Sequence, residues 1–347
     1  MVLKGENGMK VIKGLQVRMY PNDEQKKLID NTIGCCRFVY NQTLVENLNA
    51  YKKTGHGTKP NDRIKRLVSL KDENPWLKEV EASALAQAVR DFNKNLDRYI
   101  KNPTETNYPK FKSKRFAKQS YRAQYFNNGR TDIKDSHHIR ISKIGLVATK
   151  LIETPETYRL RNITVVKTKT NKYYAKLCIE TETNDLVKTG RQAGFYFGPD
   201  DTLISSDGLK IQFPRFAEKS YEYLAKNQRK LSKMRTKLEK AGVNCYKAKN
   251  YIKQKRKVAK IYEHIANQKK DFNHKLSRKL VEDYDLLAFD DTNIDNVVDD
   301  IKKRYDVAYG SLIRSIRYKS LWYGKKFVTV NQERDITKNI LNTALNM

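Results

Sequence analysis

Hydrophobic and polar residues alternate along Lys10–Met19, a period of two that predicts a β-strand. Pro21 then turns the chain, and apolar residues at helical spacing predict a helix from Glu24 to Tyr51, with further helices near residues 61–71 and 83–100. Strand patterns return later, at His138–Ile141, Gly145–Ala148, Leu160–Val166 and Tyr173–Ile179. This order predicts a small β-barrel, residues 1–20 and 102–182, into which a helical domain, residues 21–101, is inserted.

The second half, residues 190–347, has the pattern of an α/β domain. Three successive strands are expected, joined in part by a tight turn at Asp207-Gly208, and they lie at Gly194–Phe197, Thr202–Ser206 and Leu209–Phe213. Leucines seven residues apart and an apolar-lined return helix predict a basic helical hairpin at residues 217–282. A buried strand that ends in Asp290-Asp291, a helix, a strand and a short terminal helix follow. These elements favour an RNase H-like core, so the fold class is α/β plus α+β.

The balance of charge adds a functional expectation to this fold. Lysine and arginine number 70 against 39 acidic residues, a formal net charge of +31, while 39% hydrophobic residues mark a folded protein. Such a surplus repels itself unless a polyanion neutralises it, and 21 tyrosines and 12 phenylalanines supply faces on which bases can stack. Nucleic acid is therefore the expected partner. A ribosome-associated or well-solvated basic protein stays open, and composition alone implies no enzyme.

The four cysteines, Cys35, Cys36, Cys178 and Cys245, include no Cys-x-x-Cys pair, so neither a zinc site nor a disulfide framework is expected. No stretch approaches the roughly 18 apolar residues of a membrane span, and the N-terminus lacks the core of a signal peptide. No membrane partner is expected. A cytoplasmic location of bacterial type follows by default, at the nucleoid when the protein is bound to DNA.

Ordered sequence fragments resemble the TnpB family, the RNA-guided nucleases of bacterial transposons and relatives of type V CRISPR effectors. From about Met9 onward they include Tyr40-Asn41, Asn74-Pro75-Trp76-Leu77, Pro109-Lys110-Phe111-Lys112, His264-Ile265-Ala266-Asn267 and Tyr323-Gly324-Lys325-Lys326. The resemblance implies a wedge domain for the β-barrel, a recognition domain for the inserted helices and a RuvC-like nuclease domain for the second half. It also implies two partners, a guide RNA and a double-stranded target DNA with a short adjacent motif. Action as a monomer stays open.

The nuclease positions depart from the family pattern. RuvC-like nucleases hold two divalent cations between carboxylates, and the family's first aspartate corresponds to Tyr196, within Gly194–Gly198. A neutral phenol cannot bridge two cations as a carboxylate does, so a packing role is favoured over a catalytic tyrosine. The second acid, a glutamate in the family, is the shorter Asp290 here. The third is matched by Asp335, for which a helix N-cap is an equally good role.

The family's zinc finger is also missing, because only three residues separate Val330 from Arg334. These departures imply a degenerate nuclease domain with no catalytic residues and no zinc, and with no metal required for binding. The expected function is RNA-guided, sequence-specific DNA binding without cleavage, as in nuclease-dead TnpB-like repressors that act by occupying their targets. Two alternatives stay open: a residual metal-dependent nuclease that recruits Asp200, Asp201 or Asp207, and a guide-independent nucleic-acid-binding protein.

Two sets of residues are expected to carry nucleic-acid binding. The first, which the resemblance places near the DNA motif, consists of Tyr40, Asn41, Ser83, Gln87, Tyr121 and Arg122. Ser83 and Gln87 share a helix face, and a glutamine can pair with an adenine edge. The second set suits backbone phosphates and consists of Lys110, Lys112, Lys114, Arg115, Lys118, Arg229, Lys233, Lys253 and Arg256. Ordinary polar surface is the alternative for each position.

Overall fold

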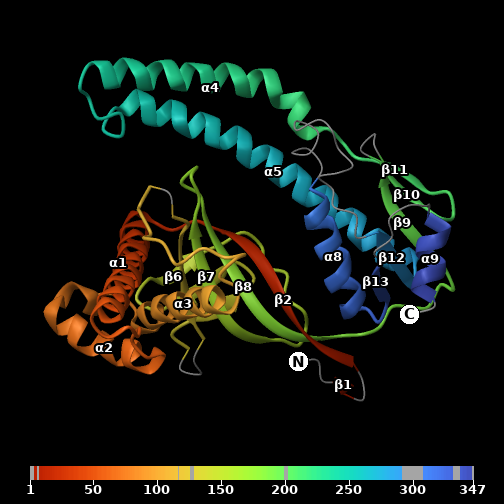
Figure 1. The fold of residues 1–347 in the computed structure, drawn as a ribbon, viewed down its shortest axis with the longest axis horizontal. Helices are drawn as coiled ribbons and strands as arrows, with labels where there is room; N and C mark the ends of the chain where they lie inside the picture. The colour runs from red at the N-terminus through yellow and green to blue at the C-terminus, as the bar shows by residue number, and fades with distance from the viewer. Residues whose placement is uncertain are drawn as a thin grey trace. The chain divides into compact units, whose positions relative to one another are not determined.

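The computed structural model describes residues 4–5, 8–115, 117–125, 129–198, 202–290, 308–330 and 337–345. The chain divides into two compact units, one of residues Ile12–Thr181 and one that joins Met1–Val11 to Glu182–Met347 (Figure 1). None of the helices in the described ranges has an apolar stretch long enough to cross a bilayer.

The helical part of the first unit consists of α1 (Asp23–Thr54), α2 (Pro60–Glu73), the short 3-10 helix η1 (Pro75–Lys78) and α3 (Ala82–Lys101). Helix α1 begins where the side chains of Asn22 and Gln25 each accept a hydrogen bond from the other's backbone amide. It ends at Gly55, whose φ of 72° favours glycine. The apolar faces of α1 and α3 pack together, with Leu85 and Phe92 of α3 fully buried.

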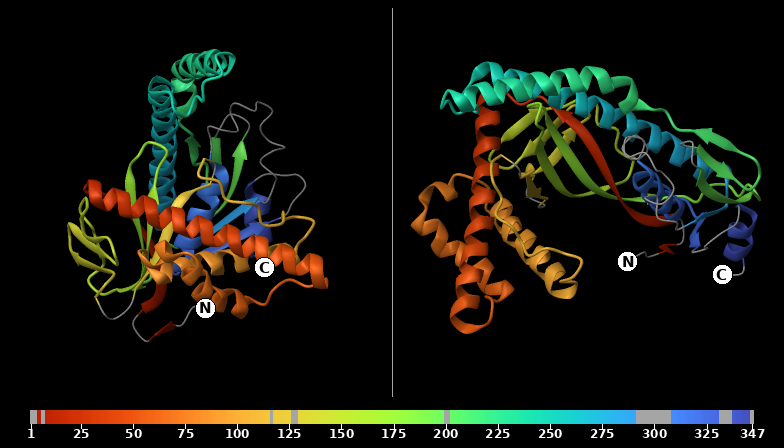
Figure 2. Two further views of the ribbon diagram at one scale, coloured as in Figure 1. Left: turned by 90° about the vertical axis from the view of Figure 1, so that its left-hand side faces the viewer. Right: turned by 45° about the horizontal axis from the view of Figure 1, so that its top comes forward.

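Two sheets accompany these helices. The larger has the order β1-β2-β8-β7-β3, formed by β1 (Lys4–Gly5), β2 (Gly8–Met19), β3 (Gln119–Gln124), β7 (Arg159–Lys167) and β8 (Tyr173–Thr183). The smaller has the order β4-β5-β6, formed by β4 (Asp132–Asp135), β5 (His138–Ile141) and β6 (Gly145–Ala148). The right-hand view of Figure 2 shows the long, twisted strands of the larger sheet.

The predicted β-barrel is not closed. Among the described residues, the smaller sheet is tied to β2 by the isolated Met19–Thr149 bridge and its flanking backbone hydrogen bonds. Closing a sheet into a barrel requires its two edge strands to pair, and here β3 pairs with β7 while β1 pairs with β2. The four-residue strands β4–β6 are too short to continue the ladder of the longer strands.

The second unit contains a mixed sheet of order β11-β10-β9-β12-β13. Its strands are β9 (Gln192–Gly198), β10 (Thr202–Ser205), β11 (Lys210–Gln212), β12 (Leu286–Asp290) and β13 (Lys326–Val330). Strands β9, β10 and β11 form an antiparallel meander, and β9, β12 and β13 run parallel. This sheet and its helices make the unit mixed α/β, as the element order predicts.

The two faces of this sheet are covered differently. Phe195 and Phe289 stack on one face with their ring centroids 4.9 Å apart, in a cluster with residues of α5 (Lys249–Asp283) and α8 (Tyr309–Trp322). The alternate strand residues point to the opposite face, because successive side chains of a strand alternate. There Tyr196 packs against a small cluster that includes Val330 and Ile340, the latter from α9 (Thr337–Leu345).

Helix α4 (Phe216–Lys240) packs along α5, and the two form the long helical pair in Figure 1. A polar contact joins them, since the buried Gln254 amide donates to the backbone oxygen of Asn227 at 3.0 Å and to its side-chain oxygen at 3.1 Å. Within α4, Asn227 alone is buried, so most side chains of this helix are at least partly exposed to solvent.

Candidate nucleic-acid interface and nuclease-like strand ends

A cleft of about 420 Å³ lies in the first unit where α1, α3 and β3 meet. Its lining includes five of the predicted binding residues, Gln87, Lys112, Lys118, Tyr121 and Arg122. Apolar side chains such as Ile33 and small ones such as Ala84 also line it. Basic groups can contact the phosphates of a nucleic acid, and a wall of apolar and small side chains can contact its exposed bases. We call this the motif cleft.

Two of the predicted residues act on the protein's own chain instead of lining the cleft. Asn41 holds the backbone of Lys112 at both groups: its amide nitrogen donates to the Lys112 carbonyl at 3.0 Å, and its oxygen accepts from the Lys112 amide at 2.9 Å. The Tyr40 ring is buried, and the Lys112 ammonium lies 3.5 Å from its centroid. Burial lowers the pKa of Lys112, and the negative charge of Asp91 opposes that shift. Tyr40 and Asn41 therefore fix one cation of the cleft in place.

The polar groups on α3 are paired with carboxylates inside the protein. The Gln87 amide donates to Asp91 at 2.9 Å, and the Ser83 hydroxyl donates to Glu81 at 2.7 Å. Burial raises the pKa of Glu81, while the bond from Ser83 lowers it. A base that hydrogen-bonds to Gln87 or Ser83 through these donors must compete with Asp91 or Glu81.

Tyr121 lies deeper than its predicted role requires. Its side chain is buried, and its hydroxyl makes no hydrogen bond with any described residue. Burial raises the pKa of Tyr121 well above its usual value, and the nearby Glu81 acts in the same direction. The next residue on β3, Arg122, is exposed, as expected because successive side chains of a strand point to opposite sides.

The remaining predicted cations do not gather at the motif cleft. Lys114 and Arg115 are exposed on the segment before β3, and Lys110 lines a different pocket. Four exposed cations belong to the helical pair of the second unit, Arg229, Lys233, Lys253 and Arg256. The first two lie one turn apart on α4, and the last two lie three residues apart on α5.

At the nuclease-like site, two of the three positions lie at the carboxyl ends of neighbouring parallel strands. Phe195 of β9 pairs with Phe289 of β12, so Tyr196 and Asp290 are the next positions along these strands. Carboxyl ends of adjacent parallel strands are the usual place for a ligand site in such a sheet. Asp335, as well as the alternative acids Asp200 and Asp201, lies outside the described residues.

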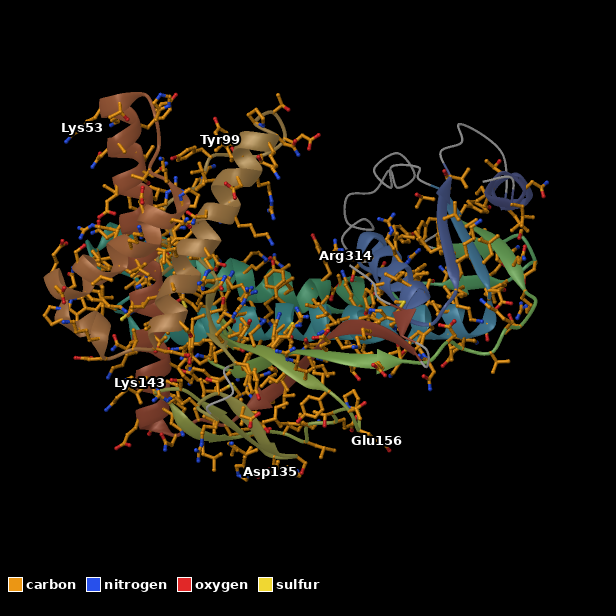
Figure 3. All side chains as sticks on the ribbon, turned by 90° about the horizontal axis from the view of Figure 1, so that it is seen from below. Lys53, Tyr99, Asp135, Lys143, Glu156 and Arg314 are labelled. Carbon is orange, nitrogen blue, oxygen red and sulfur yellow. The ribbon has the colours of Figure 1, made fainter. Side chains whose placement is uncertain are left out.

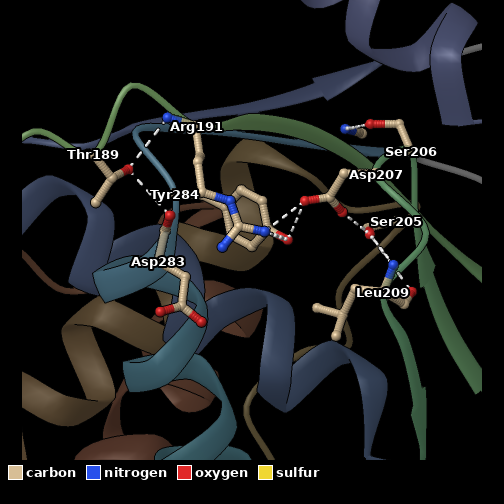
Figure 4. A network of polar contacts seen from close by, with 9 residues as sticks. Thr189, Arg191, Ser205, Ser206, Asp207, Leu209, Asp283 and Tyr284 are labelled. Atoms are coloured by element: carbon tan, nitrogen blue, oxygen red, sulfur yellow. Dashed lines mark hydrogen bonds and ion pairs between the residues drawn. The ribbon is translucent and has the colours of Figure 1, made fainter.

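Asp207 lies in the turn between β10 and β11, near the beginning of β9, and Figure 4 shows its polar contacts. Its carboxylate accepts from Arg191 at 2.6 Å and from the Tyr284 hydroxyl at 2.7 Å, and it also accepts from Ser205. Burial raises the pKa of Asp207, but these three hydrogen bonds outweigh it and hold the pKa at about 2. Ser205 pairs with Phe195 and the Ser206 amide donates to the Gly194 carbonyl, so Asp207 lies beside the beginning of β9, roughly 10 Å along the strand from Tyr196. This placement disfavours the alternative in which Asp207 supplies a nuclease acid.

The described residues contain no group of three or more histidine, cysteine or acidic side chains placed to hold a metal ion. Cys36 is buried, and that burial raises the pKa of its thiol to about 12. Such a thiol is a packing group and a poor metal ligand at neutral pH.

Two carboxylates near the cleft were missing from the predicted set. Asp91 follows Gln87 by one helical turn, so the spacing of the pair on α3 was a usable signal. Glu81 precedes α3, and nothing in its local sequence indicates that its carboxylate is buried.

Two parts of the chain match known family models. Residues 9–56 match the helix-turn-helix domain of the IS605 OrfB proteins, and residues 176–300 match the probable-transposase domain of the same proteins. In the structure, the first match covers β2 and most of α1.

Two whole-chain relatives carry similar names. A proposed RNA-guided DNA endonuclease of Streptomyces pristinaespiralis is 26% identical over 93% of this chain and 78% of its own length. The proposed RNA-guided DNA endonuclease InsQ of Escherichia coli (strain K12) is 23% identical over 93% of this chain and 81% of its own length.

A similar fold occurs in Cas12f1, solved in a complex with a guide RNA and target DNA. The two chains superpose with a TM-score of 0.56 at 12% identity, over 93% of this chain and 89% of the other. The chain thus has a mixed α/β fold that resembles the fold of Cas12f1. It is a TnpB-like protein that carries the IS605 OrfB domains.

Proposed function

We propose that this chain binds a guide RNA and, through it, double-stranded DNA beside a short sequence motif, and that it occupies this target without cutting it. Three features support the binding half of the proposal. The charge surplus of +31 favours a polyanionic partner, the relatives are named for RNA-guided action on DNA, and the motif cleft gathers five predicted binding residues.

The observation that carries the loss of cleavage is Tyr196 at the carboxyl end of β9, beside Asp290 at the end of β12. Two-metal cleavage needs oxygen ligands with negative charge at these strand ends. Tyr196 instead packs its ring against an apolar cluster. Neither zinc nor a metal for binding is part of the proposal, and repression follows from occupancy of a promoter.

The domain roles follow the same resemblance. Residues 1–20 and 102–182 form the wedge-like part, residues 21–101 the recognition part and residues 190–347 the RuvC-like part. In this assignment Gln87 meets a base edge of the motif, while Lys118 and Arg122 hold neighbouring phosphates. The exposed cations of the pair α4–α5 hold the backbone of the guide–target duplex.

The experiment is to express the chain with its native flanking DNA, purify it and sequence the RNA that co-purifies. Native-gel binding then compares a guide-matched duplex, a mismatched duplex and a matched duplex with altered flanking bases. The proposal expects one discrete RNA and binding that depends on both guide match and flank. A complex that binds matched and mismatched DNA equally would contradict it and would favour a guide-independent binder.

Variants at the cleft test the assignment of residues. Replacing Gln87 with Ala removes a base contact. The affinity for DNA with the preferred flanking bases should then fall about tenfold, as it does for one mismatched base pair. Replacing Lys118 with Gln is the matched control, because a lost phosphate contact weakens all sequences about equally. If both variants weaken binding without changing flank preference, Gln87 does not read the motif.

A residual metal-dependent nuclease is the second candidate, favoured by the acid that remains at the end of β12, Asp290. Its distinguishing result is magnesium-dependent cutting of a matched target that an Asp290→Asn variant loses.

A further inference from the structure

A second pocket of the first unit lies where the chain turns back after the C-terminal end of α3. It is shallow, about 400 Å³ in volume. Its polar lining comes from α1, from α3 and from the loop that follows, through Tyr40, Asn95, Arg98, Asn107, Tyr108 and Lys110. We call it the loop pocket.

The loop that forms one wall is held by specific contacts. The Thr106 hydroxyl donates to the carbonyl oxygens of Asn102 at 2.7 Å and Arg98 at 3.2 Å, which also satisfies acceptors at the end of α3. The ring of Tyr108 packs edge-on against Tyr99 with centroids 5.3 Å apart. Figure 3 labels Tyr99 on the last turns of α3. The wall is thus preformed, which lowers the entropic cost of binding a ligand there.

The chemistry of the loop pocket selects an anion. No acidic side chain lines it, and the exposed Arg98 and Lys110 supply two positive charges. The hydroxyl of Tyr40 accepts from Asn95 at 3.3 Å, and that of Tyr108 accepts from Asn47 at 3.0 Å. A phenol that accepts one bond still carries its own proton to donate. Cations, an amide and phenol donors around one hollow match the oxygens of a phosphate group.

The geometry points to the loop pocket as a binding site for a phosphodiester of a nucleic-acid backbone, separate from the motif cleft. Tyr40 contacts both sites. Its side chain lines the loop pocket, and its ring makes a cation–π contact with the ammonium of Lys112, which lines the motif cleft. A backbone held at the loop pocket is therefore anchored next to the cation that Asn41 positions. The inference rests on the proposed function for the class of partner, but guide pairing plays no part in it.

The test uses a double variant, Arg98→Gln with Lys110→Gln, and a control double variant, Lys94→Gln with Lys101→Gln. The control removes the same charge from exposed positions of α3 that do not line the pocket. Binding of fluorescent single-stranded RNA and of duplex DNA, both of arbitrary sequence, is measured by anisotropy across a salt series. One lost phosphate contact reduces the slope of log K against log salt by about 1 and weakens binding roughly tenfold at low salt.

We expect the pocket variant to show a smaller salt slope and weaker binding than the control variant with the RNA, the duplex DNA or both. A change on the RNA alone assigns the phosphate to RNA, and a change on the duplex alone assigns it to DNA. Equal slopes for the two variants on both probes overturn the inference. Thermal unfolding of both variants checks folding. Since the probes are not guide-matched, failure of guided binding and failure of this site give different results.

Discussion

The two ends of the sheet β11-β10-β9-β12-β13 use their polar groups in different ways. At the end where β9 and β12 begin, Asp207 and Asp285 each accept several hydrogen bonds from within the protein. At the end where these strands finish, Tyr196 packs against apolar side chains beside Asp290. In open α/β sheets the ligand normally binds at the carboxyl ends of the strands. Here the strongly held carboxylates are at the wrong end for cleavage and serve the fold.

The largest expected effect comes from breaking the buried ion pair at the beginning of β12. The side chain of Lys325 is fully buried, its ammonium lies 2.5 Å from Asp285, and it also donates to the Val187 carbonyl at 2.9 Å. Replacing Lys325 with Ala leaves Asp285 without its charge partner, so the free energy of unfolding should fall by about 3–5 kcal/mol. Urea denaturation measures this. A loss below about 1 kcal/mol would show that this end of the sheet is not held by the pair.

A smaller loss is expected at Asp207. An Asp207→Asn variant presents an amide where Arg191 and Tyr284 both donate, so the free energy of unfolding should fall by about 2 kcal/mol. Glu153→Gln is a matched control at an exposed position.

The effect of Asp207 should depend on pH in a defined direction. Its pKa in the folded protein is about 2, below the ordinary 3.8 of the unfolded chain. Its contribution to stability is therefore present above about pH 4 and is lost as the pH falls from about 4 towards 2. The difference between the natural protein and the Asp207→Asn variant should shrink across that range. If the difference in free energy of unfolding stayed constant over this pH range, the stabilising effect of Asp207 would not depend on its ionisation.

At the other end, a Tyr196→Asp variant should lose about 1–2 kcal/mol of stability, because it removes a ring from the apolar cluster and places a carboxylate beside Asp290. The same change should make the thermal midpoint rise with millimolar Mg²⁺ or Mn²⁺, since paired carboxylates bind hard cations. Scanning calorimetry with and without a chelator measures both effects. An equal metal response in the natural protein would show that a cation site exists without the substitution.

The smallest effect is expected for Tyr196→Phe. If the tyrosine only packs, loss of its hydroxyl should change the affinity for a guide-matched duplex by less than about twofold, as for a surface change of under 0.5 kcal/mol. Native-gel titration measures it. A large loss would give the hydroxyl a direct role with nucleic acid.

Local patterns were sufficient for most elements of the fold. The alternating stretch before Pro21, the long first helix and the strand ending in Asp290 all occur close to their predicted bounds. The Asp207-Gly208 turn is confirmed as well, with Gly208 at a φ of 88°. Strand β3 was not predicted, because Gln119–Gln124 has only Tyr121 and Ala123 as apolar residues.

Long-range pairing could not be predicted in the same way. Barrel closure depends on which edge strands meet, and hydrophobic periodicity carries no information about that. The contacts of Asn41 show the same limit for the site: its partner, Lys112, is 71 residues away, so the motif revealed the position but not its structural role. The sequence places Asp207 in a turn, but it does not show which groups bind the carboxylate.

The most direct test of the account is strand cleavage by the purified RNA complex. The complex is incubated with a guide-matched duplex labelled on both strands and with magnesium, and the products are separated on native and denaturing gels. The account predicts a retarded duplex whose two strands remain full length. A discrete cut product that requires magnesium and disappears in the Asp290→Asn variant would contradict it, and would show that the strand ends beside Tyr196 still form a working nuclease site.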